Sequence, residues 1–205
     1  YYIHKIFNKI SGLDHKNAFI NNLVTIAFRK NIPLEKPLAK IFNAFVMELK
    51  DEYSDLRLKY DVNQNKKTIL LVSSQILSEN HSPTQLLLEL YAALRELGFR
   101  VLVAQIQSYP TEPILPFIEP FNASYVDAIE GPSIWNFDGK EVPIYNLAAS
   151  HFKKSSLEDF LEILEKTQPG FMIHVGGYNV VQEFIASHIP SLLYTTSSML
   201  VPSPF

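Results

Sequence analysis

The chain has 205 residues, of which 47% are hydrophobic and 19% are charged, and its formal net charge is −3. This balance predicts a globular protein with a sizeable core and excludes an intrinsically disordered chain. The slightly negative charge argues against nucleic acid as the main partner, and the absence of cysteine excludes a disulfide framework and a thiolate metal site.

Residues 1–60 have the apolar spacing of amphipathic helices. Two prolines within residues 31–37 interrupt this pattern, so we expect the last of these helices to begin at about Leu38. We interpret residues 1–60 as a helical subdomain that packs on an α/β domain formed by residues 61–205. The alternative is that its apolar stripe binds a partner. The stripe consists of Ile3, Ile6, Phe7, Ile10, Phe19, Leu23, Ile26, Ile41, Phe42, Phe45, Val46 and Leu49.

Residues 66–103 read as strand, loop, helix, turn and strand. The branched run from Thr68 to Val72 predicts a strand that is buried on both faces. Ser82 is expected to cap the next helix, with Pro83 in the first helical position, and Gly98 is expected to end it in a left-handed conformation. A helix between two buried strands indicates a βαβ unit with a parallel sheet.

The remainder of the chain continues this alternation after one long interruption. Residues 107–139 contain five prolines and many aromatic side chains, which predicts a long loop that is either a lid over a ligand or docked on the core. The elements expected after it are a strand at 142–147, a helix capped by Ser155 or Ser156, and strands at 171–175 and 191–195 joined by a short helix. We therefore predict an α/β fold with a doubly wound, Rossmann-like parallel sheet preceded by a helical segment.

Ligands of such sheets bind at the carboxyl ends of the strands, near the point where the strand order reverses. Three segments are expected there: residues 73–81, 174–179 and 195–199. The first leads into a helix amino terminus, which favours an anion. The chain has no P-loop, no Gly-x-Gly-x-x-Gly fingerprint, no His-Glu-x-x-His motif and no Gly-x-Ser-x-Gly elbow. These absences argue against the usual NAD, ATP and zinc sites.

Two histidines and a glycine pair are the residues of chemical interest. His81, at the mouth of the expected crevice, is able to accept a hydroxyl proton or to hydrogen-bond a sugar, although a surface histidine is the plainer interpretation. His174 closes a buried strand, where a core histidine with satisfied hydrogen bonds is the more common case. Gly176 and Gly177 allow either a close backbone approach to a ligand or a tight turn.

Residues 69–83 (ILLVSSQILSENHSP), the helix behind them and residues 171–179 (FMIHVGGYN) resemble the amino-terminal half of bacterial GT-B glycosyltransferases. The resemblance implies two Rossmann-like domains, of which the first receives the acceptor and the second holds the nucleotide-sugar. Many such enzymes have a glycine-rich loop after the first strand, where this chain has Ser73-Ser74-Gln75. The positions carried over are His81 as the catalytic residue and a substrate-binding set of Ser74, Gln75, Ser82, Thr84, His174, Gly176, Gly177 and Asn179.

The resemblance implies an acceptor-side domain that helps to transfer a sugar from a nucleotide-sugar co-substrate to a hydroxyl or amide, with no further cofactor or metal. Because the chain opens at Tyr1 and stops after Pro202-Ser-Pro-Phe205, we expect a fragment whose partners are a carboxyl-terminal donor domain and a sugar or protein acceptor. The alternative is a non-catalytic ligand-binding or regulatory domain, since fold does not fix function. No apolar run is long enough to cross a bilayer and no signal peptide is evident, so we expect a cytoplasmic location.

Overall fold

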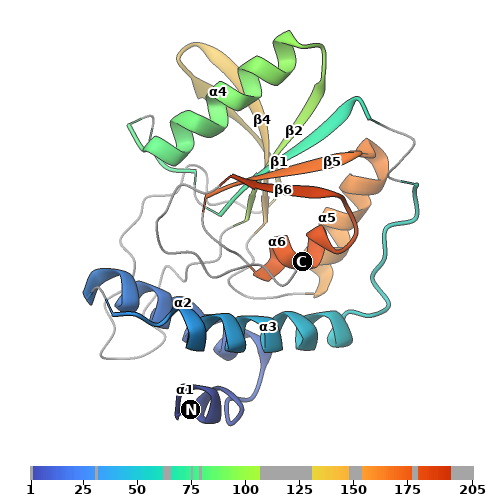
Figure 1. Ribbon diagram of the computed structural model, residues 1–205. Coiled ribbons are helices and arrows are strands. Elements are labelled where there is room, and N and C mark those ends of the chain that lie inside the picture. The colour runs from blue at the N-terminus through green and yellow to red at the C-terminus, as the bar shows by residue number, and fades with distance from the viewer. Residues whose placement is uncertain are drawn as a thin grey trace.

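The computed structural model describes residues 2–30, 32–61, 66–74, 76–78, 80–106, 131–147, 154–176 and 180–194. These residues form an α/β fold, which confirms the predicted class (Figure 1). In chain order the elements are α1 (Tyr2–Phe7), α2 (Leu13–Lys30), α3 (Glu35–Glu52), β1 (Thr68–Ser73), α4 (Ser82–Glu96), β2 (Arg100–Ile106), β3 (Gly131–Phe137), β4 (Lys140–Leu147), α5 (Lys154–Thr167), β5 (Phe171–Val175), α6 (Val180–Ala186) and β6 (Ser191–Tyr194).

One sheet organises the described residues, with the strand order β3-β4-β2-β1-β5-β6. β1 lies at its centre and pairs in parallel with both β2 and β5, and only β3 runs antiparallel to its neighbour. All six residues of β1 are buried, as its apolar run predicts for a strand covered on both faces. In chain order, β2 and β4 are added to the sheet on one side of β1, and β5 and β6 are then added on the other side of β1.

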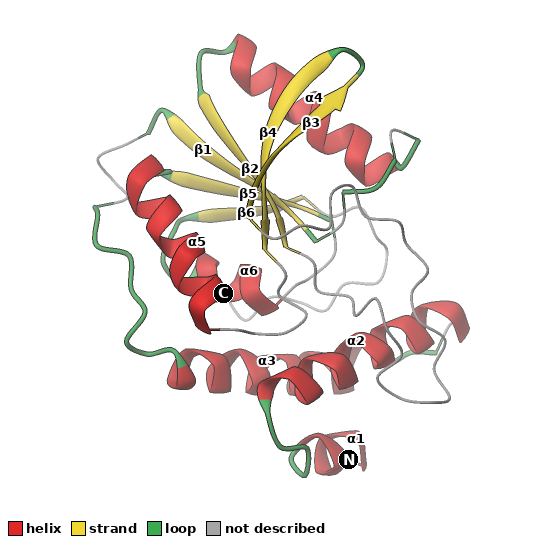
Figure 2. Ribbon diagram, turned by 180° about the vertical axis from the view of Figure 1, so that it is seen from behind, coloured by secondary structure: helices red, strands yellow, loops and turns green. Residues whose placement is uncertain are grey.

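Helices cover the two faces of the sheet unequally. α4 packs on one face, where its Leu87 and Leu88 join an apolar cluster with side chains of β1, β2 and β4. α5 and α6 pack on the opposite face and share a second cluster with the helical segment (Figures 1 and 2). α3 contacts α6, so the helical segment lies beyond α6 from the sheet.

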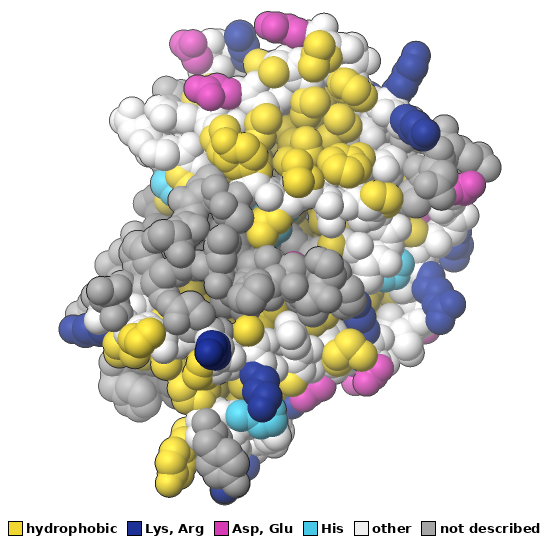
Figure 3. Space-filling view, in the orientation of Figure 1, with side chains coloured by type: hydrophobic (Ala, Val, Ile, Leu, Met, Phe, Trp, Pro, Cys, Tyr) yellow, Lys and Arg dark blue, Asp and Glu magenta, His cyan; other side chains and the backbone are white. Residues whose placement is uncertain are grey.

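Part of the α4 face of the sheet remains exposed, and we call Phe171, Ile173, Leu192 and Tyr194 the open face. The strand registers place these side chains on the face that α4 occupies, where α4 contacts β1, β2 and β5 but leaves these four residues partly or largely exposed. Leu192 is 52% exposed and Tyr194 47% exposed. Figure 3 shows hydrophobic side chains gathered over this part of the molecule.

The sequence predicted the carboxyl end of α4 correctly and its amino end incorrectly. Gly98 has φ +84°, and the amide of Phe99 donates to the Leu94 carbonyl at 3.0 Å, which confirms the left-handed helix end. The expected cap at Ser82 is wrong. Ser82 is already helical and His81, with extended φ and ψ angles, is the residue that precedes the helix; no side chain caps it.

The predicted loop at residues 107–139 is wrong over its last part. Residues 131–137 form β3, an edge strand that pairs antiparallel with β4 through the turn Asp138-Gly139. Both turn residues have positive φ, 47° and 73°, which is the pattern of the type I′ turns common in two-residue hairpins. Pro132 is tolerated because an edge strand need not donate every amide. Residues 107–130, with most of the expected lid, lie outside the described residues.

Two predicted helix starts are also wrong by a few residues. α3 begins at Glu35 rather than near Leu38, because Pro37 then occupies the first turn, where its missing amide has no intrahelical partner to lose. α5 begins at Lys154, so Ser155 and Ser156 lie in the first turn and do not precede the helix.

An ion pair between Lys16 and Glu48 joins α2 to α3.

The segment between α3 and β1 is fastened to the amino edge of the sheet. The Tyr60 hydroxyl donates to the Pro169 carbonyl at 3.0 Å, and the Lys59 amide donates to a Glu165 carboxylate oxygen at 3.2 Å. Burial raises the pKa of the Tyr60 phenol, so this hydroxyl remains a donor throughout the physiological pH range. These bonds hold the helical segment on the α5 and α6 side.

Candidate functional site at the carboxyl edge of the sheet

The strand order reverses at β1, since successive strands are added on one side of it and then on the other. Ser73 of β1 pairs with Val175 of β5, so the residues that follow, Ser74 and Gly176, leave neighbouring strands at the same edge. Ser74 is buried, and Gly176 is buried with φ +119°. Sheets of this kind bind ligands in the crevice at such a point.

The loop that leaves β1 is held by the first turn of α4. The buried Thr84 hydroxyl accepts the Leu77 amide at 3.0 Å and lies 2.9 Å from Nδ1 of His81. This three-residue arrangement fixes the path by which the loop enters the helix. His81 is half-buried, at the same sheet edge as Ser74.

Because Nδ1 of His81 is bonded to Thr84, the direction of that hydrogen bond determines whether Nε2 is an acceptor or a donor toward a ligand. If Nδ1 donates to the Thr84 oxygen, Nε2 carries the lone pair that a general base needs. If the Thr84 hydroxyl donates to Nδ1, Nε2 carries the proton and is a donor to a ligand. Burial lowers the pKa of His81, which favours the neutral ring that both arrangements require.

The lowered pKa of His81 predicts a pH-dependent contribution to stability. Because the unfolded chain binds this proton more readily than the folded chain, the contribution is complete above the unfolded pKa and is lost as the pH falls through the lower folded value. Between about pH 7.5 and pH 5 the free energy of unfolding should therefore fall less in His81→Asn than in the unsubstituted chain. Urea unfolding at several pH values measures this, with Ser82→Ala at the exposed neighbouring position as the control. Equal slopes for His81→Asn and the unsubstituted chain would contradict the assignment.

A ladder of amide and hydroxyl groups crosses the α4 face beside this loop. Gln105 of β2 is fully buried; its Oε1 accepts the Ile76 amide at 2.8 Å and its Nε2 donates to Asn146 Oδ1 at 3.2 Å. Asn146 of β4 then donates to the Ser133 hydroxyl of β3 at 3.1 Å. The ladder ties three strands to the loop. This ladder was not predicted, although polar residues near the ends of apolar strands were its signal in the sequence.

The sheet separates the two predicted histidines. His174 pairs with Val72, whose side chain belongs to the cluster on the α5 and α6 face, and His174 is 4% exposed. His81 precedes α4 and therefore lies on the side of the other face. In α6, Gln182 and Glu183 are also buried. The two histidines therefore lie on opposite faces of the sheet, at the same edge.

The other predicted site residues have different surroundings. Thr84 is buried within the loop anchor described above, and Ser82 is exposed in the first turn of α4. Gln75, Gly177 and Asn179 lie outside the described residues, as do residues 195–199.

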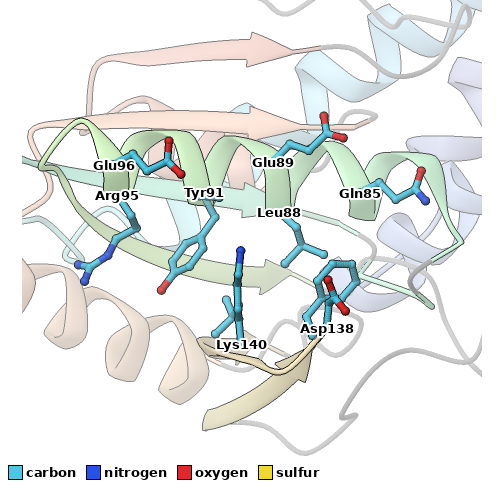
Figure 4. Close-up of a pocket in the computed structure, with 11 residues that line it drawn as sticks. Gln85, Leu88, Glu89, Tyr91, Arg95, Glu96, Asp138 and Lys140 are labelled. Carbon is cyan, nitrogen blue, oxygen red and sulfur yellow. The ribbon is translucent and has the colours of Figure 1, made fainter.

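A pocket lined by described residues lies elsewhere, between α4 and the β3–β4 hairpin. It has a volume of about 580 Å³ and includes Tyr91, Arg95 and Lys140 in its lining (Figure 4). These residues were not predicted, because β3, the first strand of the hairpin, was interpreted as part of a loop at residues 107–139. The Asp138-Gly139 pair, between two runs with alternating apolar residues, was the signal that indicates a hairpin.

Within the described part of the chain, no group of three or more histidine, aspartate or glutamate side chains is placed to bind a metal ion. No helix in that part is long and apolar enough to span a membrane. The sequence matches no known protein family, and neither a curated protein nor a solved structure is significantly similar to it.

Proposed function

We propose that this chain is the acceptor-side domain of a nucleotide-sugar-dependent glycosyltransferase, which transfers a sugar to an acceptor hydroxyl or amide. The observation that carries the proposal is the reversal of strand order at β1, with Ser74 and Gly176 leaving adjacent strands beside the loop that ends at His81. In this proposal the acceptor lies against that edge. Nε2 of His81 takes the proton from the nucleophilic hydroxyl or amide of the acceptor, while Thr84 orients the imidazole ring.

The side chains at the carboxyl edge of the sheet favour the binding of an acceptor over the binding of a nucleotide diphosphate. The groups nearest the loop are neutral hydroxyl and amide side chains, such as Ser74, Thr84 and Gln105, which suit hydroxyl-rich ligands. Neither residues 73–81 nor residues 167–205 contain a lysine or arginine to pair with phosphates. The donor therefore belongs to a second domain, as in the two-domain enzymes that the sequence resembles.

The proposal predicts a loss of turnover in His81→Ala. In the longest natural polypeptide that contains this sequence, release of nucleoside diphosphate from a panel of nucleotide-sugars should fall on the order of 10²-fold. Loss of the His81–Thr84 hydrogen bond should lower the free energy of unfolding by only about 1 kcal/mol, which is too little to explain such a loss of turnover, and the exposed His15→Ala should keep full turnover. No transfer with any donor, or micromolar binding of a nucleotide-sugar by residues 1–205 alone in calorimetry, would overturn the proposal.

The second candidate is a non-catalytic, ligand-binding domain, and the loop anchor is the observation that favours it. Thr84 and His81 already hold the entry to α4, which is a complete structural role for both residues. In that case His81→Ala should lower stability and any measured activity in parallel. The same experiment therefore distinguishes the two candidates.

A further inference from the structure

The pocket between α4 and the β3–β4 hairpin has no part in the proposed function. Its walls come from α4 and from the start of β4, so most of it lies toward the amino ends of the strands, and Gln85, next to Thr84, is the lining residue nearest the acceptor edge. α4 rises about 16 Å from Gln85 to Glu96, the lining residues nearest its two ends, so the pocket is an elongated groove. Its volume of about 580 Å³ is in the range of small-molecule sites.

The apolar part of the pocket is formed by side chains anchored in the core. Leu88 and Val142 are 7% and 2% exposed and belong to the apolar cluster under α4. Phe137 packs against the same cluster and contacts Trp135 edge-to-face, with 5.2 Å between the ring centroids. The binding surface is therefore fixed before any ligand arrives, which reduces the entropy lost on binding.

Two cations stand beside this apolar surface. Lys140 begins β4 and points toward α4 between Tyr91 and Leu88, and Arg95 stands next to Tyr91 at the rim (Figure 4). Within the described residues neither cation makes an ion pair, and neither do the lining carboxylates of Glu89, Glu96 and Asp138. In Figure 4 the side chains of Glu89 and Glu96 leave α4 on the side away from Lys140, and Asp138 lies on the Leu88 side of Lys140, so the charged side chains nearest Tyr91 on the hairpin side of α4 are the two cations.

We propose that this pocket binds a small amphiphilic anion. Its apolar body packs against Leu88, Phe137 and Val142, and its carboxylate or phosphate lies between Lys140 and Arg95, with the Tyr91 hydroxyl as a further donor. Charge-assisted hydrogen bonds of this type are stronger than neutral ones, and the apolar surface supplies most of the buried area.

Octanoate, octyl phosphate, 1-octanol and octylamine are suitable probes, because they share one apolar chain and differ in the head group. Titration of the isotope-labelled chain by two-dimensional NMR should shift the resonances of residues 85–96 and 137–142. Both anions should bind more tightly than octanol, and octylamine should bind most weakly. The tighter anion identifies the head group as a carboxylate or a phosphate.

The matched variants separate the charge from the apolar surface. The Lys140→Gln, Arg95→Gln double variant should weaken anion binding by about tenfold or more and leave octanol binding unchanged. Ala92→Trp should block every probe by filling the groove, and Lys36→Gln, at an exposed position on α3, should have no effect. Tightest binding of octylamine, unchanged anion binding in the double variant, or shifts confined to the open face would overturn the proposal.

Discussion

Replacing Phe45 with alanine should lower the free energy of unfolding by about 3–5 kcal/mol, the usual cost of a large cavity in a core. Phe45 is fully buried in α3 and belongs to the apolar cluster that the helical segment shares with β1 and α6. Its ring meets that of Phe7 edge-to-face, with 6.2 Å between the centroids, so the substitution also removes an aromatic contact between α1 and α3.

Urea unfolding followed by circular dichroism measures this loss. Met47 lies two residues away on the same helix and is 54% exposed, so Met47→Ala is the matched control and should change stability by about 0.5 kcal/mol at most. If Phe45→Ala and Met47→Ala behaved alike, α3 would not be part of the common core.

The second large effect is expected at Gln105, whose substitution by leucine should cost about 2–4 kcal/mol. Leucine has a similar size, but it leaves the buried backbone amide of Ile76 and the side-chain Oδ1 of Asn146 without the partners they have in the native chain. The cost arises from these unpaired groups, because each was removed from water on folding. Hydrogen exchange of the Ile76 amide should accelerate in the same variant.

Gln85→Leu is the matched control for Gln105→Leu. Gln85 is exposed on α4, so the same chemical change there should alter stability by about 0.5 kcal/mol or less. A small effect at Gln105 together with unchanged exchange at Ile76 would show that the ladder does not hold the loop.

The sequence predicted the central βαβ unit because each of its parts has a local cause. The apolar run of β1 is strand-like, α4 has one apolar stripe, and Gly98 supplies the left-handed helix end. β3 was missed because the prolines of residues 107–139 outweighed the hairpin signal at Asp138-Gly139. The rule that prolines exclude strands is strict only in the middle of a sheet, and β3 lies at its edge.

The candidate site was less accessible to sequence analysis than the fold. The edge at which Ser74 and Gly176 emerge follows from the alternation of strands and helices. The face on which His174 lies does not, because it depends on the register between β1 and β5. Arg95 and Lys140 are distant in sequence and line one pocket only because the fold brings the β3–β4 hairpin beside α4, so local spacing contains no signal for this pocket.

The central position of β1 has a consequence for how the chain is synthesised and truncated. Its first neighbour, β2, follows after a single helix, but Ile69 meets Phe171 of β5 only after about a hundred further residues have been made. Until then the most apolar strand of the sheet has one edge without its partner, and exposed apolar edges pair readily with other chains. A polypeptide that ends before Phe171 therefore leaves one edge of β1 unpaired, even if all of its helices form.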